Sequence, residues 1–397
     1  VTGWTVDPQD GRFLVADFPF APEDGWTYSF AVGGTRADFS CFPAGTGRKT
    51  LPYIAGVADI PKNNRRVIRY DRRTLPSPDS FRDLDLSSVK VFVPQEWASV
   101  TTFIATNDWQ NGVLVLASNT GMPIGQFNQG YKIYNSRVGM TEPGSWMYSI
   151  GAKKIFYWPR EGETAANLRG EVARLGQIVH LKGAHDVALR GIVFEGCAKS
   201  ARMKELDGSA VGCRIMTGDG TTVEDCEFRN LAGCGFASYH AKGVTVRRTH
   251  LHHLDDTGAW IYGGDRTLIE DCEAWTDMAN VFRIGFECNA SYFKDIRVRR
   301  IDVLHAAANY RDVTDDWANC VFYLQPANDM TMEDLSFEDI RIRGEGPLAL
   351  FSAYCHAWGC TPVCFLRDGK HRRGNGMTAG NGNDLKTTNI PTRRTGK

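Results

Sequence analysis

A six-residue phrase recurs through the second half of this chain and constrains its fold more than any other feature. Each copy runs apolar, charged, charged or small, small or apolar, variable, apolar. A repeat of about 20–30 residues with one strand per copy is typical of solenoids, because a single unit cannot bury its own apolar face. The phrase therefore predicts an all-β stack of coils. Its copies begin at Leu189, Val223, Val246, Ile269, Val298 and Met332.

The spacing of the phrase and the local composition divide the 397 residues into three parts. Residues 1–165 are rich in aromatic residues and in short alternating segments, which predicts a separate β-rich unit. Within it, 143–159 has the pattern of a hairpin that turns at 150–153. Residues 166–358 contain the coils. Residues 359–397 are basic, glycine-rich and poor in bulky apolar residues, so we expect a disordered tail.

Charge and hydropathy exclude two classes of partner. The net charge is zero, which gives no basic field for nucleic acid or an anionic membrane. No apolar run approaches the roughly 18 residues of a transmembrane helix. The chain begins with Val1 and shows no signal peptide, so we expect its natural start to be missing.

Two of the 11 cysteines occupy the same slot of the phrase. Cys226 and Cys272 stand in its fourth position, which faces the interior of the stack, and Thr249 fills that slot between them. Two coils of about 4.8 Å each would hold their α-carbons beyond the ~7 Å limit for a disulfide. We expect both to be small buried residues without a bridge.

The acidic residues follow a second repeated alignment, that of the strand after each phrase. The strands that follow each phrase are preceded by Asp207, Leu231, Asp256, Asp277 and Asp316, and Asp255 adds a second carboxylate at one coil. Equivalent positions of a parallel stack lie above one another, so we expect a row of carboxylates on one face. Carboxylates about 4.8 Å apart repel, which raises at least one pKa. A protonated acid beside an ionised partner suits glycosidic bond cleavage. The alternative is that each Asp caps its own turn.

Aromatic and basic residues accompany the row. Trp260 follows Asp256, Tyr239 and His240 end the preceding strand, and Arg283 lies beyond Asp277. Aromatic faces stack on sugars, and His or Arg binds hydroxyl or uronate groups, so these residues and Asp207 are the predicted substrate-binding residues. The alternatives are that Trp260 fills the interior and that Arg283 pairs with Glu287.

A metal site at His250, His252 and His253 is not expected. Strand alternation puts His250 and His252 on one side and His253 on the other. We predict neither a metal nor a cofactor.

The segment PGSWMYSIGAKKIFYWPREGE, followed by VHLKGAHDVALRGIVFEG and HLHHLDDTGAWIYGGD, resembles large right-handed parallel β-helix glycoside hydrolases of families 120 and 141. The similarity covers Val1 to Asp277, and the later coils look more like those of polygalacturonases. It implies a pectate-lyase-like right-handed parallel β-helix, with a β-sandwich-like inserted unit before the main helix. It also implies a secreted or periplasmic enzyme acting on a xylan- or fucose-containing polysaccharide.

These inferences give one predicted function and two rivals. The prediction is a monomeric glycoside hydrolase that uses Asp256 and Asp277, with Asp255 or Asp316 assisting. It binds a polysaccharide or oligosaccharide and neither nucleic acid nor membrane. The rivals on the same scaffold are a non-catalytic glycan-binding solenoid and a polysaccharide lyase or epimerase, which would need a Lys or Arg base.

Overall fold

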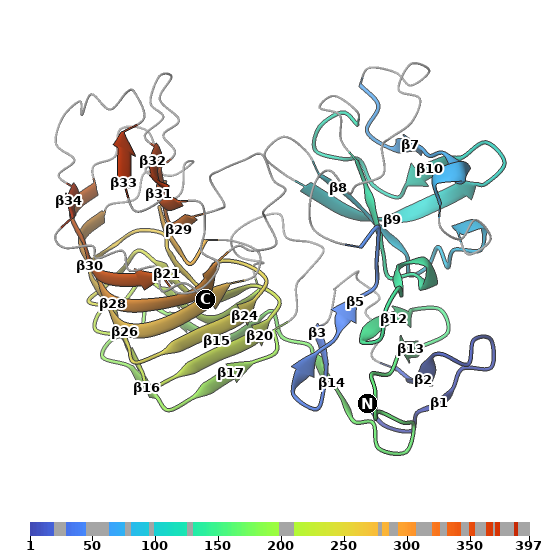
Figure 1. Ribbon diagram of the computed structural model, residues 1–397, viewed down its shortest axis with the longest axis horizontal. Helices are drawn as coiled ribbons and strands as arrows, with labels where there is room; N and C mark the ends of the chain where they lie inside the picture. The colour runs from blue at the N-terminus through green and yellow to red at the C-terminus, as the bar shows by residue number, and fades with distance from the viewer. Residues whose placement is uncertain are drawn as a thin grey trace. The chain divides into compact units, whose positions relative to one another are not determined.

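A computed structural model gives the structure of the chain (Figure 1). It describes residues 1–19, 29–44, 63–75, 81–94, 99–124, 130–197, 210–276, 280–285, 293–306, 320–325, 332–342, 349–353, 363–367, 370–373 and 385–387. The chain forms two compact units: unit 1 is Val1–Ala173 and unit 2 begins at Arg174. This division lies close to the boundary predicted after residue 165.

Among its described residues, unit 1 contains three sheets and the short 3-10 helices η3 (Arg72–Thr74) and η4 (Arg137–Gly139). One of these sheets contains, in spatial order, β1 (Thr5–Val6), β2 (Leu14–Asp17), β13 (Lys154–Tyr157), β12 (Ser145–Ser149) and β5 (Asp38–Phe39). The second contains β6 (Cys41–Phe42), β11 (Lys132–Tyr134), β8 (Lys90–Pro94), β9 (Ser99–Asp108), β10 (Val113–Leu116) and β7 (Val67–Arg69). The third contains β14 (Gly170–Ala173), β3 (Ser29–Val32) and β4 (Thr35–Arg36).

Aromatic residues build the core of unit 1. The predicted hairpin is present, because β12 and β13 are antiparallel and pair Trp146 with Tyr157. Phe30 packs against both rings, with centroids 5.3 Å from Trp146 and 5.6 Å from Tyr157. All three side chains are buried. Large rings with many contacts provide a core for a unit whose strands are short.

Unit 2 is the predicted right-handed parallel β-helix. One face, here called the first sheet, stacks β15 (Gln177–Lys182), β18 (Val211–Met216), β21 (Cys234–Tyr239), β25 (Ala259–Ile261), β27 (Phe282–Gly285), β29 (Cys320–Gln325) and β31 (Ala349–Ala353), all parallel. The second face begins with β16 (Ala188–Arg190), β19 (Thr222–Glu224), β22 (Ala241–Lys242) and β23 (Thr245–Arg247). The third begins with β17 (Val193–Glu195), β20 (Glu227–Leu231) and β24 (His250–Leu254). In later coils, β26 (Gly264–Thr276), β28 (Phe293–Ala306) and β30 (Met332–Ile342) continue across both of these faces.

The repeated phrase stacks as expected in five coils and is shifted in the sixth. Leu189, Val223, Val246, Ile269 and Val298 are successive register partners. Val298, however, pairs with Phe337 and not with Met332, whose partner is Phe293. The sixth copy therefore begins at Phe337. The prediction of Met332 is wrong because β30 contains two similar apolar–charged segments, and only the second is in register with the phrase.

The fourth position of the phrase faces the interior, as predicted. Cys226, Thr249 and Cys272 are all buried, and both cysteines have free thiols. Inside the stack, Phe194 and Phe228 lie parallel with ring centroids 4.3 Å apart.

The third position forms a corner with positive φ in every coil. The residues are Gly191, Asp225, Arg248, Asp271, Arg300 and Asp339, with φ between 48° and 62°. This left-handed conformation is uncommon outside glycine and costs roughly 1–2 kcal/mol per residue. Five of the six corners are charged residues, so the sequence places side chains there despite this cost.

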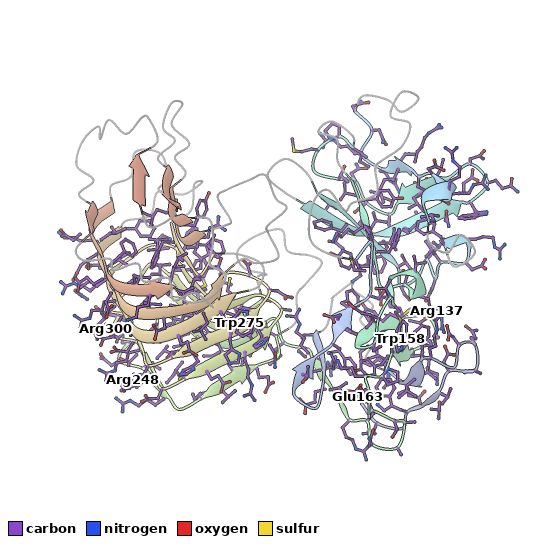
Figure 2. The ribbon with its side chains drawn as sticks, in the orientation of Figure 1. Arg137, Trp158, Glu163, Arg248, Trp275 and Arg300 are labelled. Atoms are coloured by element: carbon purple, nitrogen blue, oxygen red, sulfur yellow. The ribbon has the colours of Figure 1, made fainter. Side chains whose placement is uncertain are left out.

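The charges at the second and third positions alternate in sign from coil to coil. The second position runs Arg190, Glu224, Arg247, Glu270, Arg299 and Glu338 through successive register partners. Glu224 accepts from Arg190 and Arg247 at 3.0 Å each, and also pairs with Arg248. Figure 2 shows Arg248 and Arg300 along the same edge of the stack. We call this double column the charge ladder.

Three strands lie within residues 359–397. β32 (Val363–Arg367) pairs antiparallel with β31 and with β33 (Lys370–Arg373), and β34 (Leu385–Thr387) pairs with β30. The disorder expected for this segment therefore does not extend to these three strands, which gain backbone partners at the end of the stack. Its other residues lie outside the described ranges.

Candidate functional site

The outward side of the first sheet carries a column of large polar and aromatic residues. Arg214, Ala237, Trp260, Arg283 and Tyr323 are successive register partners on β18, β21, β25, β27 and β29. Parallel strands stack equivalent positions directly, so residues 23 or more apart in sequence become neighbours. Tyr239 and Tyr262 extend this surface next to the column. We call these residues the Arg–aromatic face: Arg214, Tyr239, Trp260, Tyr262, Arg283 and Tyr323.

Contacts between arginine and aromatic rings organise this face. The Arg283 guanidinium lies 4.3 Å from the Trp260 ring centroid and 5.7 Å from that of Tyr323. The Arg214 guanidinium lies 4.7 Å from the Tyr239 ring. Cations near aromatic faces are attracted by about 0.5–2 kcal/mol, more when desolvated. Both arginine heads are thus held by rings on the outer side of the sheet.

Trp260 belongs to this outer face and not to the solenoid interior. It clusters with Val211, Cys234, Tyr239 and Tyr262, whereas its neighbours Ala259 and Ile261 belong to the main core. Its indole Nε1 donates to the Gly285 carbonyl oxygen at 3.1 Å, which fixes the ring. The alternative that Trp260 fills the interior is therefore wrong. On β25 the side chains of Ala259 and Ile261 point into the core, so the side chain of Trp260 between them points outward.

Asp256 lies at the edge of this face, in the bend before β25. Its carboxylate accepts the Thr257 backbone N–H at 2.8 Å, and the Thr257 hydroxyl donates to Asn280 Oδ1 at 2.9 Å. The side chain is partly exposed. Asp256 has the local turn contact expected of a cap, and it also lies beside the binding-type residues of the face.

Two buried groups respond to the charge of Asp256. Burial, reinforced by the nearby Asp256 carboxylate, raises the pKa of the Cys234 thiol well above its usual value. Burial also raises the pKa of Tyr239, with a smaller contribution from Asp256, while Arg214 and Arg283 act in the opposite direction. Tyr239 is 3% exposed, and its hydroxyl has no hydrogen-bond partner among the described residues. The carboxylate, the phenol and the two guanidinium groups therefore share one electrostatic environment.

The predicted site residues fall into three groups. Asp256, Tyr239, Trp260 and Arg283 come together at this face. His240 follows the far end of β21 with φ of 51°, exposed and edge-on to Tyr262 at 5.5 Å, so it lies away from Asp256. Asp255 is partly exposed, and its backbone N–H bonds to the Leu231 carbonyl at 3.1 Å. Asp207, Asp277 and Asp316, like Glu287, lie outside the described residues.

The register of the described strands bears on the carboxylate row. Ala259, Phe282 and Phe322 are register partners. Counted along the sequence, Asp256 lies three positions before Ala259, Asp277 lies five before Phe282, and Asp316 lies six before Phe322. The three carboxylates are therefore not equivalent in register, and their shared orientation stays a prediction.

Sequence reasoning missed Arg214, Cys234, Tyr262 and Tyr323. Arg214 is 2% exposed and stands three register steps from Arg283. A sequence signal existed, because aligning VGCRIM with NVFRI places both arginines on the same side of their strands. The carboxylate row was found by aligning the Asp residues that precede each strand, and that alignment does not bring the two arginines into the same position.

The histidines near Asp255 lie differently from what alternation predicts. His253 has φ of 52°, so the chain turns there and His253 Nδ1 lies 2.7 Å from His252 Nδ1. His252 Nε2 is 2.9 Å from a Glu227 oxygen, and His253 packs on Trp275 with centroids 4.8 Å apart. Within the described ranges, no group of three or more His, Cys, Asp or Glu side chains is arranged to hold a metal ion.

Comparison with known proteins supports the fold. The family model described as "Right handed beta helix region" matches residues 178–300. The comparison with curated proteins found no match. A solved structure named "Glycoside hydrolase" is similar with a TM-score of 0.51 and 13% identity, over 89% of this chain and 80% of that chain.

Two tailspike structures show weaker similarity. Tailspike gp49 of Pseudomonas phage LKA1 has a TM-score of 0.23 and 9% identity, over 79% of this chain and 46% of that one. Tailspike gp61 of Pseudomonas phage phi297 has a TM-score of 0.22 and 11% identity, over 74% and 47%. Among the described residues, no helix has the length and apolar composition needed to cross a membrane. The parallel coils and the matching family model together establish a right-handed parallel β-helix in unit 2.

Proposed function

We propose that unit 2 is a glycoside hydrolase whose substrate lies against the Arg–aromatic face. The observation that carries this proposal is the position of Asp256 at the edge of a surface containing Trp260, Tyr239 and Arg283. The rings of Trp260 and Tyr239 are buried, 7% and 3% exposed, and Trp260 positions the partly exposed Arg283 guanidinium, whose N–H groups can donate to hydroxyl or carboxylate oxygens. A partly exposed carboxylate beside such a surface can act on a bound glycosidic bond.

Asp256 and Asp277 are the proposed catalytic pair, with Asp255 or Asp316 assisting. One carboxyl group protonates the leaving oxygen, and the other acts as nucleophile or as base toward water. Asp207 and His240 are proposed secondary substrate contacts. The similarity to a glycoside hydrolase structure agrees with this proposal at the level of the fold. A xylan- or fucose-containing polysaccharide is the proposed substrate, and a secreted or periplasmic location suits such a polymer.

The test is release of reducing sugar from a panel of polysaccharides by the 397-residue chain and its Asp256→Asn and Asp277→Asn variants. Each substitution removes one carboxyl group and should lower the rate by at least about 100-fold, the lower end of what a positioned acid or base contributes. Asp225→Asn is the matched control, because Asp225 lies at one of the corners with positive φ, where it pairs with Arg248. Full activity in both Asp256 and Asp277 variants would refute the assignment.

A lyase is the second candidate, because it needs a Lys or Arg base and both Arg214 and Arg283 lie on the Arg–aromatic face. A lyase releases an unsaturated sugar that absorbs in the ultraviolet, whereas a hydrolase does not. Ultraviolet-absorbing product that depends on Arg283 would favour the lyase over the hydrolase. Binding of a glycan without any product would favour the non-catalytic solenoid.

A further inference from the structure

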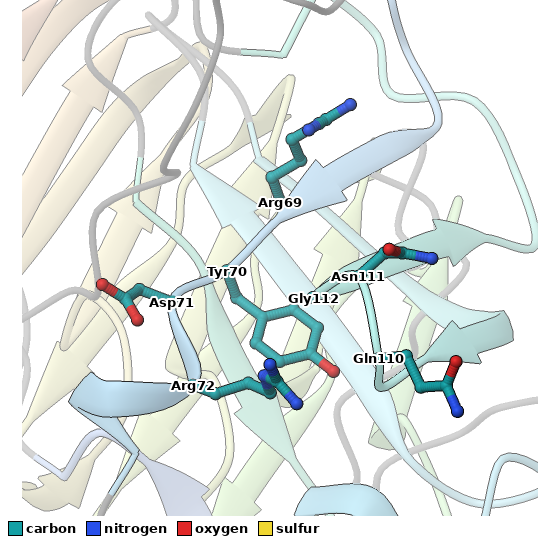
Figure 3. A pocket seen from close by; sticks show the side chains of 7 residues that line it. All are labelled: Arg69, Tyr70, Asp71, Arg72, Gln110, Asn111 and Gly112. Carbon is teal, nitrogen blue, oxygen red and sulfur yellow. The ribbon is translucent and has the colours of Figure 1, made fainter.

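Unit 1 contains a shallow, open cleft of about 290 Å³, and none of the predicted site residues belongs to its lining (Figure 3). It is lined by residues 69–72, at the end of β7 and the start of η3, and by residues 110–112, in the turn between β9 and β10. We propose that this cleft is a separate binding site for an acidic sugar, namely a carboxylate-bearing unit of a glycan. This site does not depend on catalysis by unit 2.

The floor of the cleft is rigid. β7 and β10 pair antiparallel, and the Tyr70 backbone N–H donates to the Gly112 carbonyl oxygen at 2.8 Å. Gly112 has φ of +65°, and a Cβ there would meet the Tyr70 carbonyl oxygen at 2.5 Å, so glycine alone permits this approach. The Tyr70 hydroxyl is 2.8 Å from Asn107 Oδ1, which orients the ring. A preformed floor lowers the entropic cost of binding.

The one acidic side chain of the lining does not neutralise the cleft. Asp71 pairs with Arg73 at 2.7 Å, and this contact lowers the pKa of Asp71 to about 2. Figure 3 shows the Asp71 carboxylate pointing away from the side where Tyr70, Arg72 and Gln110 gather. The lining therefore carries two arginines against one carboxylate, a net charge of +1, and Asp108 near Tyr70 stands outside the lining.

Two donors on this side are available to a ligand. Within the part of the chain that the structure describes, the Arg72 side chain makes no hydrogen bond or ion pair, and its guanidinium lies 5.5 Å from the Trp109 ring centroid. The Gln110 side-chain amide likewise has no hydrogen-bond partner among those residues, and both side chains are exposed. A guanidinium held against an indole presents its N–H groups in a fixed fork that matches a carboxylate.

The surroundings favour a sugar over a free anion. Trp109 is partly exposed and lies next to Tyr70, with centroids 6.3 Å apart, so aromatic surface borders the cationic group. Side-chain amides both donate to and accept from the alcohol hydroxyl groups of a sugar, and a sugar also has the apolar ring face that inorganic phosphate lacks. A ligand with one carboxylate, several hydroxyls and an apolar ring face would use all of these groups.

The experiment measures how three ligands bind to the 397-residue chain: an oligogalacturonate, a neutral xylo-oligosaccharide of the same length, and inorganic phosphate. Calorimetry gives the affinity, and the fluorescence difference between the wild type and Trp109→Phe reports occupation of this cleft. We expect the acidic oligosaccharide to bind best. We also expect Arg72→Gln to weaken that binding at least about tenfold, the effect of losing a charge-assisted hydrogen bond.

Arg82→Gln is the matched control, because Arg82 is a surface arginine of the same unit, 51% exposed at its side chain, and pairs with Asp83 outside the lining of the cleft. It should change the affinity less than about twofold, a surface ion pair being a weak interaction. Arg283→Gln should leave the Trp109-dependent signal intact, which separates this site from the Arg–aromatic face. Three results would overturn the proposal: equal losses in the variants at positions 72 and 82, phosphate binding as tight as that of the acidic oligosaccharide, or no Trp109-dependent binding.

Discussion

Replacing Glu270 by Gln tests whether the charge ladder stabilises the β-helix. Glu270 accepts from Arg299 Nε at 2.8 Å and from Arg300 Nη2 at 2.7 Å. Its side chain is 10% exposed, while those of the two arginines are 37% and 40% exposed. Gln keeps the shape and one acceptor oxygen but removes the negative charge, so two guanidinium groups lose their shared partner.

The expected loss of stability follows from these contacts. Hydrogen bonds to charged groups contribute about 1.5–3 kcal/mol each, and solvent screening of the exposed arginines lowers the total. Arg300 also keeps its contact with Asp271 at 2.5 Å. We therefore expect a loss of about 2 kcal/mol in the free energy of unfolding. For a domain of 150–250 residues this corresponds to roughly 4–8 °C in the unfolding midpoint.

The assay is thermal unfolding followed by circular dichroism in low salt. Glu273→Gln is the control, because Glu273 lies on the same strand, is 43% exposed and contacts His250 at 3.6 Å. That variant should shift the midpoint by no more than about 1–2 °C, as expected for a surface pair. Equal shifts in the two variants would refute the reasoning, since exposure and pairing would then not matter.

Further predictions concern pH, packing and the corners. Burial opposes ionisation of Glu270, but Arg299 and Arg300 outweigh it and lower its pKa below the usual 4.5. This stabilisation is complete above about pH 4.5 and lost as the pH falls through the folded pKa, so the midpoint difference between wild type and Glu270→Gln should shrink on acidification. Phe228→Ala should cost about 3–5 kcal/mol in chemical denaturation, because Phe228 is fully buried and stacked on Phe194. Gly218→Ala should lower the thermal midpoint more than Gly191→Ala. Both have positive φ and incur roughly 1–2 kcal/mol, but a Cβ at Gly218 also meets a backbone oxygen at 2.1 Å, whereas Gly191 has open space.

The fold followed from periodicity because the interior of a parallel stack repeats. Leu189, Val223, Val246, Ile269 and Val298 are apolar at register positions that all face the core. The same reasoning failed at Met332, where one strand contains two similar segments and periodicity alone does not say which is in register. The stacking partner, here Phe337 on Val298, decides that choice.

The candidate site was less predictable because it lies where the chain is irregular. Asp256 precedes its strand by a bend whose length varies between coils, so aligning acidic residues does not align their positions in space. Arg214 and Arg283 stand within strands, where register is strict, and comparing strand interiors would have found them. The convergence of His252 and His253 depends on one residue with positive φ, which strand alternation does not anticipate.

The alternation of sign along the charge ladder has a consequence for how this helix could lengthen or shorten. A coil carrying Arg247 and Arg248 is flanked by coils carrying acidic pairs, and the next basic pair comes two coils away. Duplicating or deleting one coil would bring like charges into direct contact along the edge, whereas adding or removing two adjacent coils would preserve every attraction. The structural module of this solenoid is therefore the coil pair.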